Sequence, residues 1–400
     1  VLAGCGGGDA SEGGQAVVPV PTPAVPVPAV PAPAPTPTPA PAPAPVVPPA
    51  VTMTNPAPGS GKFAGANFWN IDWQGQPEYF RAGVNFATTA DPWRTDLVAD
   101  LAPYKVLRFM DWNDINAAST PQAHFSTRKA KTAAQGKPVA YEWQIDLCNR
   151  ADKDCWITVH SQSNAEDWRQ LAQMIKASLK PALRVYIEWS NEVWNPDFPQ
   201  HAYAEAEARR LMLPGSNPAA AYSVYASVRL FDEFGKVFAG ESRRLVRVLA
   251  GQSQWTGPCD AQLEALSNAQ TNPSRIWPDA YAIAPYLKGT SIQTLRAAIP
   301  GASAGVANHR ACPQRMGVPL IAYEGGSDSF VLGSGCANLQ RDAGMRDLYR
   351  EYLTAMTAAG LNGPFMQYTH TGECWGVKVH TGDAAANSPK FQGLMDWLSS

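Results

Sequence analysis

The sequence predicts an α/β protein whose folded part is a single (β/α)8 TIM barrel, and three observations lead to this prediction. Between residues 59 and 400, short apolar segments with β-branched and aromatic residues alternate with longer segments of helical periodicity. Eight strand-like segments occur, and helix-like segments separate them, as a (β/α)8 barrel requires. A doubly wound open sheet is the alternative fold, but the Gly-x-Gly-x-x-Gly loop that normally follows its first strand is absent there.

Each expected strand is a short run of side chains that suit a buried sheet. The eight strands are expected at residues 80–86, 106–110, 156–160, 185–195, 244–252, 280–287, 319–326 and 364–370. The helices between them show apolar positions three and four residues apart. They are expected at residues 95–104, 141–148, 165–179, 203–213, 219–239, 291–299, 340–359 and 391–398.

The first 58 residues have a different composition from the rest of the chain. Residues 1–5, Val-Leu-Ala-Gly-Cys, resemble the end of a bacterial lipoprotein signal, in which Cys5 would receive the lipid. Residues 6–58 consist mostly of Pro, Ala, Val and Thr, a composition typical of an extended spacer without a core. We therefore expect an extracytoplasmic protein, anchored by lipid in the bacterial outer membrane, whose barrel is carried on a stalk.

Composition and charge limit the classes of ligand. The net charge of −2 and the 16% of charged residues argue against binding of nucleic acid or of a membrane surface, which requires a concentrated positive field. Neutral, hydroxyl-rich ligands fit better, and the 13 Trp residues offer flat faces for sugar rings, although many of them will lie in the core. We expect no cofactor and no metal, and a chain that acts as a monomer.

Six cysteines remain when Cys5 is set aside. An even number in an exported protein indicates disulfides, and six cysteines allow fifteen pairings. Pairs that join neighbouring segments of the expected fold are favoured, namely Cys148 with Cys155, Cys259 with Cys312, and Cys336 with Cys374.

Ionisable side chains collect at the carboxyl ends of the expected strands, where the active sites of such barrels lie. Two of them are carboxylates, Glu192 and Glu324, and cleavage of a glycosidic bond requires such a pair. One carboxyl group protonates the leaving oxygen while the other attacks the sugar or activates water. The remaining polar candidates at these ends are Arg108, His160, Tyr286 and His370.

The alternation of side chains along a strand makes two geometric predictions. Asn191 and Glu192 are neighbours, so both can line a site only if the strand bulges or ends between them. On the seventh strand, Leu320, Ala322 and Glu324 share one face, and we expect Glu324 to point inward.

The Asn191-Glu192 pair that ends the fourth strand and the Glu324 that ends the seventh resemble the arrangement of the clan A retaining glycoside hydrolases, which include cellulases and mannanases. The strings Trp-Ile-Thr-Val-His at 156–160 and Tyr-Ile-Glu-Trp-Ser-Asn-Glu-Val-Trp-Asn at 186–195 are similar to bacterial members labelled cellulose-binding. The resemblance implies that Glu192 is the general acid and base, that Asn191 holds the sugar 2-hydroxyl, and that Glu324 is the nucleophile.

The same resemblance implies that Arg108 and Tyr286 form hydrogen bonds to the nucleophile, and it matches His160 less closely. The eighth strand departs from the best-known cellulase pattern, which has a Trp at its tip. Here Tyr368 and His370 come first, and Trp375 follows in the loop.

Aromatic residues after the strands are candidates for sugar-binding subsites. Trp194, Trp255 and Trp375 follow the fourth, fifth and eighth strands, and we include them with His370 among the substrate-binding candidates. Glu188 lies on the same strand face as Glu192, and we expect it to be an interior charge paired with a neighbour.

The sequence therefore predicts a retaining glycoside hydrolase that cleaves a β-linked polysaccharide, a glucan or a related plant or bacterial exopolysaccharide. The alternative is a non-catalytic carbohydrate-binding barrel that has kept the cleft, and the presence of both glutamates argues against it. A structural lipoprotein of the cell envelope is a third reading, which the cleft residues do not favour.

Overall fold

The computed structural model describes residues 62–68 and 76–400, which belong to one compact unit. Cys5 and the expected stalk at residues 6–58 lie outside the described residues, so the lipid anchor and the spacer stay predictions. No helix in the described part of the chain has both the length and the apolar character needed to cross a membrane.

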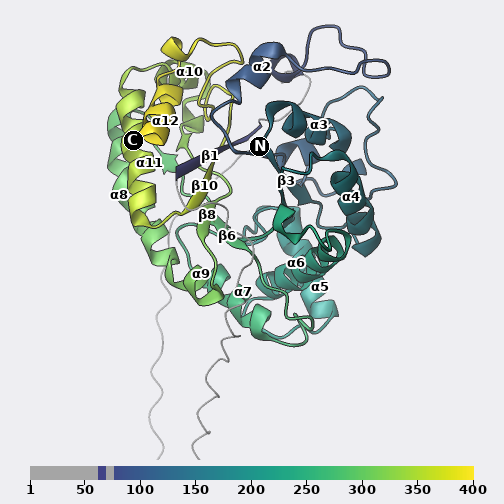
Figure 1. The fold of residues 1–400 in the computed structure, drawn as a ribbon. Helices are drawn as coiled ribbons and strands as arrows, with labels where there is room; N and C mark the ends of the chain where they lie inside the picture. The colour runs from purple at the N-terminus through teal and green to yellow at the C-terminus, as the bar shows by residue number, and fades with distance from the viewer. Residues whose placement is uncertain (1–61, 69–75) are drawn as a thin grey trace, which may run out of the picture. The chain divides into compact units, whose positions relative to one another are not determined.

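The described residues form a closed barrel of eight parallel strands, which confirms the predicted (β/α)8 fold. The strands occupy the centre and the helices surround them (Figure 1). Around the barrel the order is β1, β10, β8, β6, β5, β4, β3 and β2, and β2 closes onto β1. The barrel strands are β1 (Lys62–Asn67), β2 (Val106–Arg108), β3 (Asp154–Val159), β4 (Val185–Trp189), β5 (Leu245–Ala250), β6 (Ala280–Ile283), β8 (Leu320–Ala322) and β10 (Gly363–Gln367).

A separate two-stranded sheet pairs β7 (Leu287–Lys288) with β9 (Ser327–Asp328), beyond the ends of β6 and β8. Twelve α-helices occur in the described residues, most of them on the outside of the barrel (Figure 1). They are α1 (Gln76–Tyr79), α2 (Thr95–Asp100), α3 (Tyr141–Ala151), α4 (Ala165–Ser178), α5 (Pro199–Arg210), α6 (Pro218–Val237), α7 (Gly257–Ser267), α8 (Ile292–His309), α9 (Ala311–Met316), α10 (Cys336–Gln340), α11 (Gly344–Ala359) and α12 (Pro389–Ser399).

Local sequence signals fix several helix ends. The Asn164 side chain accepts hydrogen bonds from the first turn of α4 while Asp167 bonds back, forming a capping box. Asn217 caps α6 just before Pro218, which occupies the first helical position without the loss of a hydrogen bond. Gly360 ends α11 in the left-handed conformation that favours glycine.

Two cores lie on opposite sides of the barrel wall. The larger one packs the helices on the outward faces of the strands and includes Leu320 and Ala322. The smaller one fills the barrel interior and includes Trp156, Tyr186 and Tyr323. As predicted, Leu320 and Ala322 share one face, and Glu324 points inward, where it meets Arg108. The prediction that Glu324 shares that face was wrong, because the strand ends at Ala322 and the alternation does not extend to Glu324.

The first predicted strand was also wrong. Residues 80–86 form a turn, and Phe80 makes only an isolated bridge with Trp93. Its aromatic rings pack together, with the centroids of Phe80 and Phe86 5.0 Å apart. The first barrel strand is Lys62–Asn67, whose small residues allow close pairing with β10 and β2.

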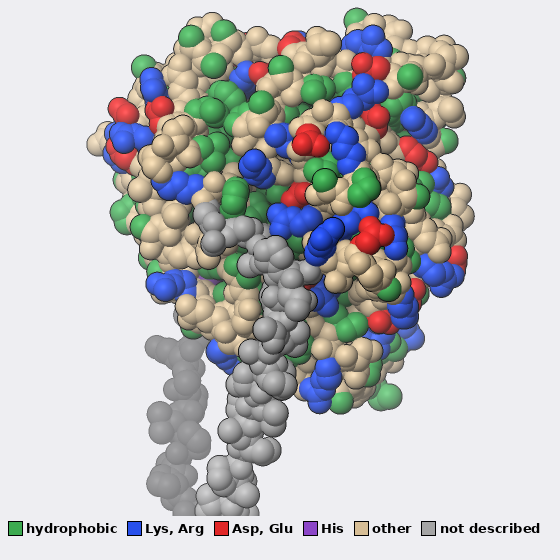
Figure 2. Space-filling model, in the orientation of Figure 1, with side chains coloured by type: hydrophobic (Ala, Val, Ile, Leu, Met, Phe, Trp, Pro, Cys, Tyr) green, Lys and Arg blue, Asp and Glu red, His purple; other side chains and the backbone are tan. Residues whose placement is uncertain are grey.

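The structure contains the three predicted disulfides, Cys148–Cys155, Cys259–Cys312 and Cys336–Cys374. Disulfides are typical of proteins outside the cytoplasm. On the face shown in Figure 2, basic and acidic side chains are interspersed with apolar ones, and no field of one sign covers it.

Candidate active site

Arg108, at the end of β2, is the centre of a buried polar network at the carboxyl ends of the strands. Its side chain is fully buried, and its Nη1 donates a 2.8 Å hydrogen bond to Oε1 of Glu324. Its Nη2 donates to Glu188 and to Asn191, both at 2.9 Å. Its Nη1 also donates to Oδ1 of Asn67 at 3.2 Å. One guanidinium thus holds two carboxylates and two amides, which its planar fork of donors allows.

Glu324 follows β8 and is fixed by two donors on different strands. Besides Arg108, the hydroxyl of Tyr286 donates a 2.8 Å hydrogen bond to Oε2 of Glu324. Glu324 is 4% exposed. Both carboxylate oxygens therefore have a defined position.

Glu188 is the predicted interior charge with a partner, and the structure confirms this. Its Oε2 accepts hydrogen bonds from Arg108 and, at 2.9 Å, from the indole Nε1 of Trp156. Burial raises the pKa of Glu188, and the charge of Arg108 opposes this shift. Glu188 lies on β4 inside the barrel, and its ion pair with Arg108 holds the guanidinium in place.

The tip of β4 has the irregular backbone that the Asn191-Glu192 pair requires. The strand ends at Trp189, and Ser190 and Glu192 have positive φ angles of 59° and 43°. Such angles are uncommon outside glycine, and active sites are among the places where they occur. They turn Asn191 toward Arg108 and also bring Glu192 to the site.

Asn191 is held from its other side as well. Its Nδ2 donates to Oδ1 of Asn116, and Gln200 donates to both Asn116 and the Asn191 carbonyl oxygen. The amide orientation is thereby fixed, with its oxygen on Arg108.

Glu192 lies in an environment that differs from that of Glu324. Its Oε1 accepts a 2.9 Å hydrogen bond from the hydroxyl of Tyr323, and its Oε2 accepts one from Asn195 at 3.2 Å. Burial, together with the charge of Glu324, raises the pKa of Glu192 to about 7, against the effect of these hydrogen bonds. Glu192 is therefore close to half-protonated near neutral pH.

Sequence reasoning missed several residues of this site, among them Tyr323, Asp111 and Tyr368. The hydroxyl of Tyr323 donates a hydrogen bond to Glu192. The position of Tyr323 in the expected strand gave no indication of that contact. Asp111 follows β2, and its Oδ2 accepts a 3.0 Å hydrogen bond from the hydroxyl of Tyr368 at the tip of β10. Burial and the nearby Glu324 raise the pKa of Asp111 to about 6. The sequence indicated these two residues only by their positions. Tyr368 directly follows β10, and Asp111 comes three residues after the end of β2.

The two predicted histidines lie outside the Arg108 network. His160 makes a 2.9 Å hydrogen bond to the carbonyl oxygen of Ala117 through Nε2. His370 is fully buried, and its Nδ1 lies 3.1 Å from the hydroxyl of Tyr104. Burial lowers the pKa of His370 to about 4, so it is neutral at physiological pH.

The predicted tryptophans occupy different places. Trp375 lies in the loop after β10, with its ring centroid 5.9 Å from that of Tyr368. Trp255 is 54% exposed in the loop after β5, and Trp194 is half-buried in the turn after β4. Trp112, by contrast, is fully buried in an aromatic cluster with Phe68.

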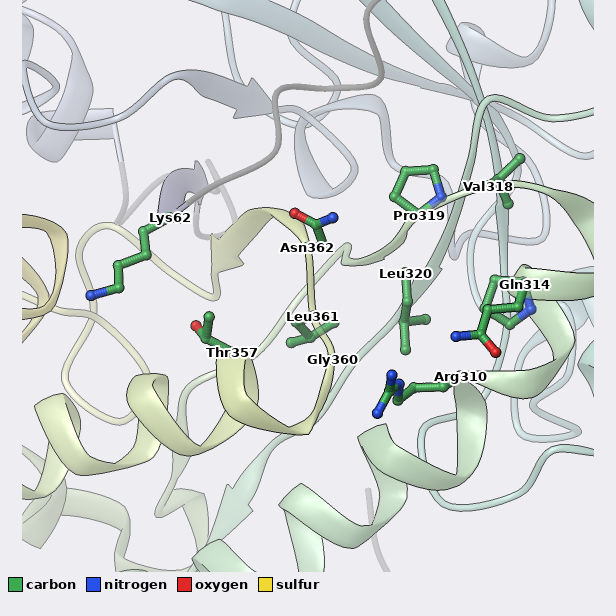
Figure 3. A pocket seen from close by; sticks show the side chains of 11 residues that line it. Lys62, Arg310, Gln314, Val318, Pro319, Leu320, Thr357, Gly360, Leu361 and Asn362 are labelled. Atoms are coloured by element: carbon green, nitrogen blue, oxygen red, sulfur yellow. The ribbon is translucent and has the colours of Figure 1, made fainter. Parts of the chain in front are cut away.

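A separate hollow of about 480 Å³ lies at the opposite end of the barrel, where β1, β8 and β10 begin (Figure 3). Lys62, Arg310, Gln314, Leu320 and Asn362 are among the side chains that line it. None of the residues in the Arg108 network contributes to it.

No protein-family model and no curated protein matches this sequence. Solved structures do resemble its fold. A GH51 arabinofuranosidase from Xanthomonas axonopodis pv. citri gives a TM-score of 0.53 at 12% identity over 84% of this chain and 73% of that one. An α-L-arabinofuranosidase from Thermotoga maritima gives 0.51 at 11% identity over 84% and 70%.

A third similar structure is a 4-O-α-L-rhamnosyl-β-D-glucuronidase from Fusarium oxysporum, with a TM-score of 0.50 at 15% identity over 84% of this chain and 68% of that one. All three are named as glycosidases. At these identities the similarity establishes the shared barrel fold.

Proposed function

We propose that this chain is a glycoside hydrolase that cleaves a β-linked polysaccharide with retention of configuration. The observation that carries the proposal is the pair of carboxylates in opposed environments at the carboxyl end of the barrel. Glu324 is bonded by Arg108 and Tyr286, whereas Glu192 has a pKa raised to about 7. Environments that separate two carboxyl groups in this way divide the roles of nucleophile and acid. The glycosidase names of similar structures agree with this class.

In the first step, Glu324 attacks the anomeric carbon. The bond to the leaving oxygen breaks as the proton of Glu192 passes to that oxygen, so the departing sugar leaves as a neutral alcohol. Arg108 and Tyr286 fix the attacking carboxylate, and Asn191 is placed to bond the sugar 2-hydroxyl.

In the second step, Glu192 is a carboxylate and acts as the base. It accepts a proton from water, whose oxygen attacks the anomeric carbon and releases Glu324. The enzyme returns to its starting protonation state, and the product keeps the configuration of the substrate.

The further residues proposed to bind substrate are His160, Trp194, Trp255, His370 and Trp375, of which His160 and His370 are buried behind the surface. We further propose that Cys5 carries a lipid and that residues 6–58 hold the barrel away from the bacterial outer membrane. The three disulfides agree with a location outside the cytoplasm.

A panel of soluble polysaccharides tests the proposal. The expected result is release of reducing ends from at least one β-linked glycan, with mass analysis of the products and NMR showing the β-anomer first. Initial formation of the α-anomer would contradict retention. Binding to glycans without release of reducing ends from any of them would favour the alternative, a non-catalytic carbohydrate-binding barrel.

A further inference from the structure

We propose that Phe330 and Trp375 form an outer sugar-binding subsite, on which a sugar ring of the polysaccharide stacks beyond the bond that is cleaved. This inference rests on the proposed function, and it specifies the substrate as a chain that occupies several subsites. Phe330 lies outside the network around Arg108, and its role follows from an aromatic surface that leads away from Glu324.

The two rings form an exposed apolar platform. Their centroids are 4.9 Å apart with an angle of 9° between the planes, so they stack face to face. Phe330 is 62% exposed and its neighbour Val331 is 81% exposed, unusual values for large apolar side chains. A flat aromatic face open to solvent is suited to the apolar face of a sugar ring.

Ring contacts connect the platform to the proposed nucleophile. From Trp375 the aromatic contacts lead to Tyr368, at 5.9 Å, and from Tyr368 to Tyr286, at 6.1 Å. Tyr286 donates its hydroxyl to Glu324. An unbroken series of rings thus joins the exposed Phe330 to the proposed nucleophile, and this continuity identifies the occupant as the same carbohydrate chain.

The platform is also firmly supported. Oδ1 of Asp328 accepts a 3.1 Å hydrogen bond from the indole Nε1 of Trp375 and a 3.2 Å bond from the backbone N–H of Phe330. One carboxylate oxygen therefore fixes residues of two loops, one after β8 and one after β10.

A covalent link joins the same two loops. The disulfide Cys336–Cys374 connects α10 to the residue before Trp375, and Gln340 donates a hydrogen bond to the Cys374 carbonyl oxygen. Lys390 donates to the carbonyl oxygen of Trp375 from below. A surface aromatic pair held in this way loses little freedom on binding, which favours affinity.

The position of the platform defines the class of substrate. The rings of Trp375 and Tyr368 lie between Phe330 and Tyr286, the residue that bonds Glu324, so one sugar ring does not extend from Phe330 to the reacting carbon. The substrate is therefore an oligosaccharide or polysaccharide, and activity on it depends on chain length. Small aryl glycosides that reach only Glu324 do not use the platform.

Native gels that contain hydroxyethylcellulose, barley β-glucan, galactomannan or xylan test this inference. The proteins compared are full-length Glu324→Gln alone and Glu324→Gln combined with Phe330→Ala, Phe330→Trp or Met212→Ala. Met212 is a matched control, because it is 81% exposed and follows α5, outside the loops that carry Phe330 and Trp375. Unfolding curves of the four proteins show whether each variant is folded.

At least one polysaccharide is expected to retard Glu324→Gln. Phe330→Ala should weaken the apparent affinity for this polysaccharide by about tenfold, the effect of losing one aromatic contact at a binding surface, while Phe330→Trp and Met212→Ala keep the affinity.

Retardation that Phe330→Ala leaves unchanged overturns the subsite and leaves the proposed function standing. If no polysaccharide retards Glu324→Gln or the unmodified protein, the proposed function fails and the subsite fails with it. If Phe330→Ala abolishes self-association in sedimentation without affecting retardation, the platform is a protein contact and the inference is wrong.

Discussion

The two ends of the barrel use charged side chains in opposite ways. At the carboxyl end, Arg108 and Glu188 are 0% and 2% exposed and are bonded to each other inside the barrel. At the amino end, ion pairs such as Lys180–Asp152 lie at the surface, where the two side chains are 50% and 74% exposed. Burying charge is costly unless every charged group is bonded, so the interior network indicates a functional requirement that the surface pairs do not.

The ends also differ in their hollows. The hollow at the amino end has a volume of about 480 Å³, and no carboxylate side chain lines it (Figure 3). The carboxyl end instead gathers Glu192, Glu324 and Asp111 around one guanidinium. Convergent polar groups with shifted pKa values therefore indicate a functional site, whereas the volume of a hollow does not by itself indicate one.

The largest difference between the two ends is expected for Glu324→Gln. Loss of the proposed nucleophile should lower kcat at least about 10³-fold on any polysaccharide that the unmodified protein cleaves. The unfolding transition should stay cooperative, since the amide keeps the shape of the carboxylate. Near-normal kcat in this variant would remove Glu324 from the mechanism.

Breaking the buried pair tests the cost of interior charge. Glu188→Gln should lower the free energy of unfolding by about 3 kcal/mol, because Arg108 loses one of its two charged partners inside the barrel. Urea denaturation measures this change. The control is Arg209→Ala, which removes the exposed pair with Glu205 and should change the free energy of unfolding by less than about 0.5 kcal/mol. Equal effects in the two variants would contradict the contrast drawn here.

The pH dependence of activity reports on Glu192. As an acid, Glu192 must be protonated, so activity should fall as the pH rises through its pKa of about 7. Tyr323 donates a hydrogen bond to its carboxylate and thereby favours the charged form. Tyr323→Phe should therefore raise this pKa and move the basic limb of the kcat profile upward by up to about one pH unit. A shift in the opposite direction would contradict the assigned contact.

The smallest effect is expected at the amino end. Arg310→Gln changes an exposed side chain that lines the hollow, and it should alter the free energy of unfolding by less than about 0.5 kcal/mol. The kcat of this variant should stay within about twofold of that of the unmodified protein. A large loss of kcat would show that the hollow takes part in the reaction.

Sequence patterns sufficed for the fold wherever strands were apolar and helices were periodic. They failed at residues 80–86, whose aromatic side chains pack against one another in a turn. They also failed at Lys62–Asn67, because small residues give little indication of a strand. The barrel nevertheless followed from the remaining strands, because their order and spacing allowed few other arrangements.

The site was predictable where residues directly follow strands, as for Arg108 and Glu324. Contacts that depend on three-dimensional packing could not be predicted. The hydroxyl of Tyr323 reaches Glu192 only because the backbone leaves β4 with positive φ angles. Asp111 meets Tyr368 across 257 residues of sequence. Such contacts arise from barrel closure, which no local pattern encodes.

Trapping of the covalent intermediate tests the central claim most directly. The protein is incubated with a 2-deoxy-2-fluoro glycoside of the sugar that it cleaves, and the labelled peptide is identified by mass spectrometry. One label is expected, on Glu324, and no label is expected in Glu324→Gln. A label on Glu192, on Glu188 or on any other residue would contradict this claim.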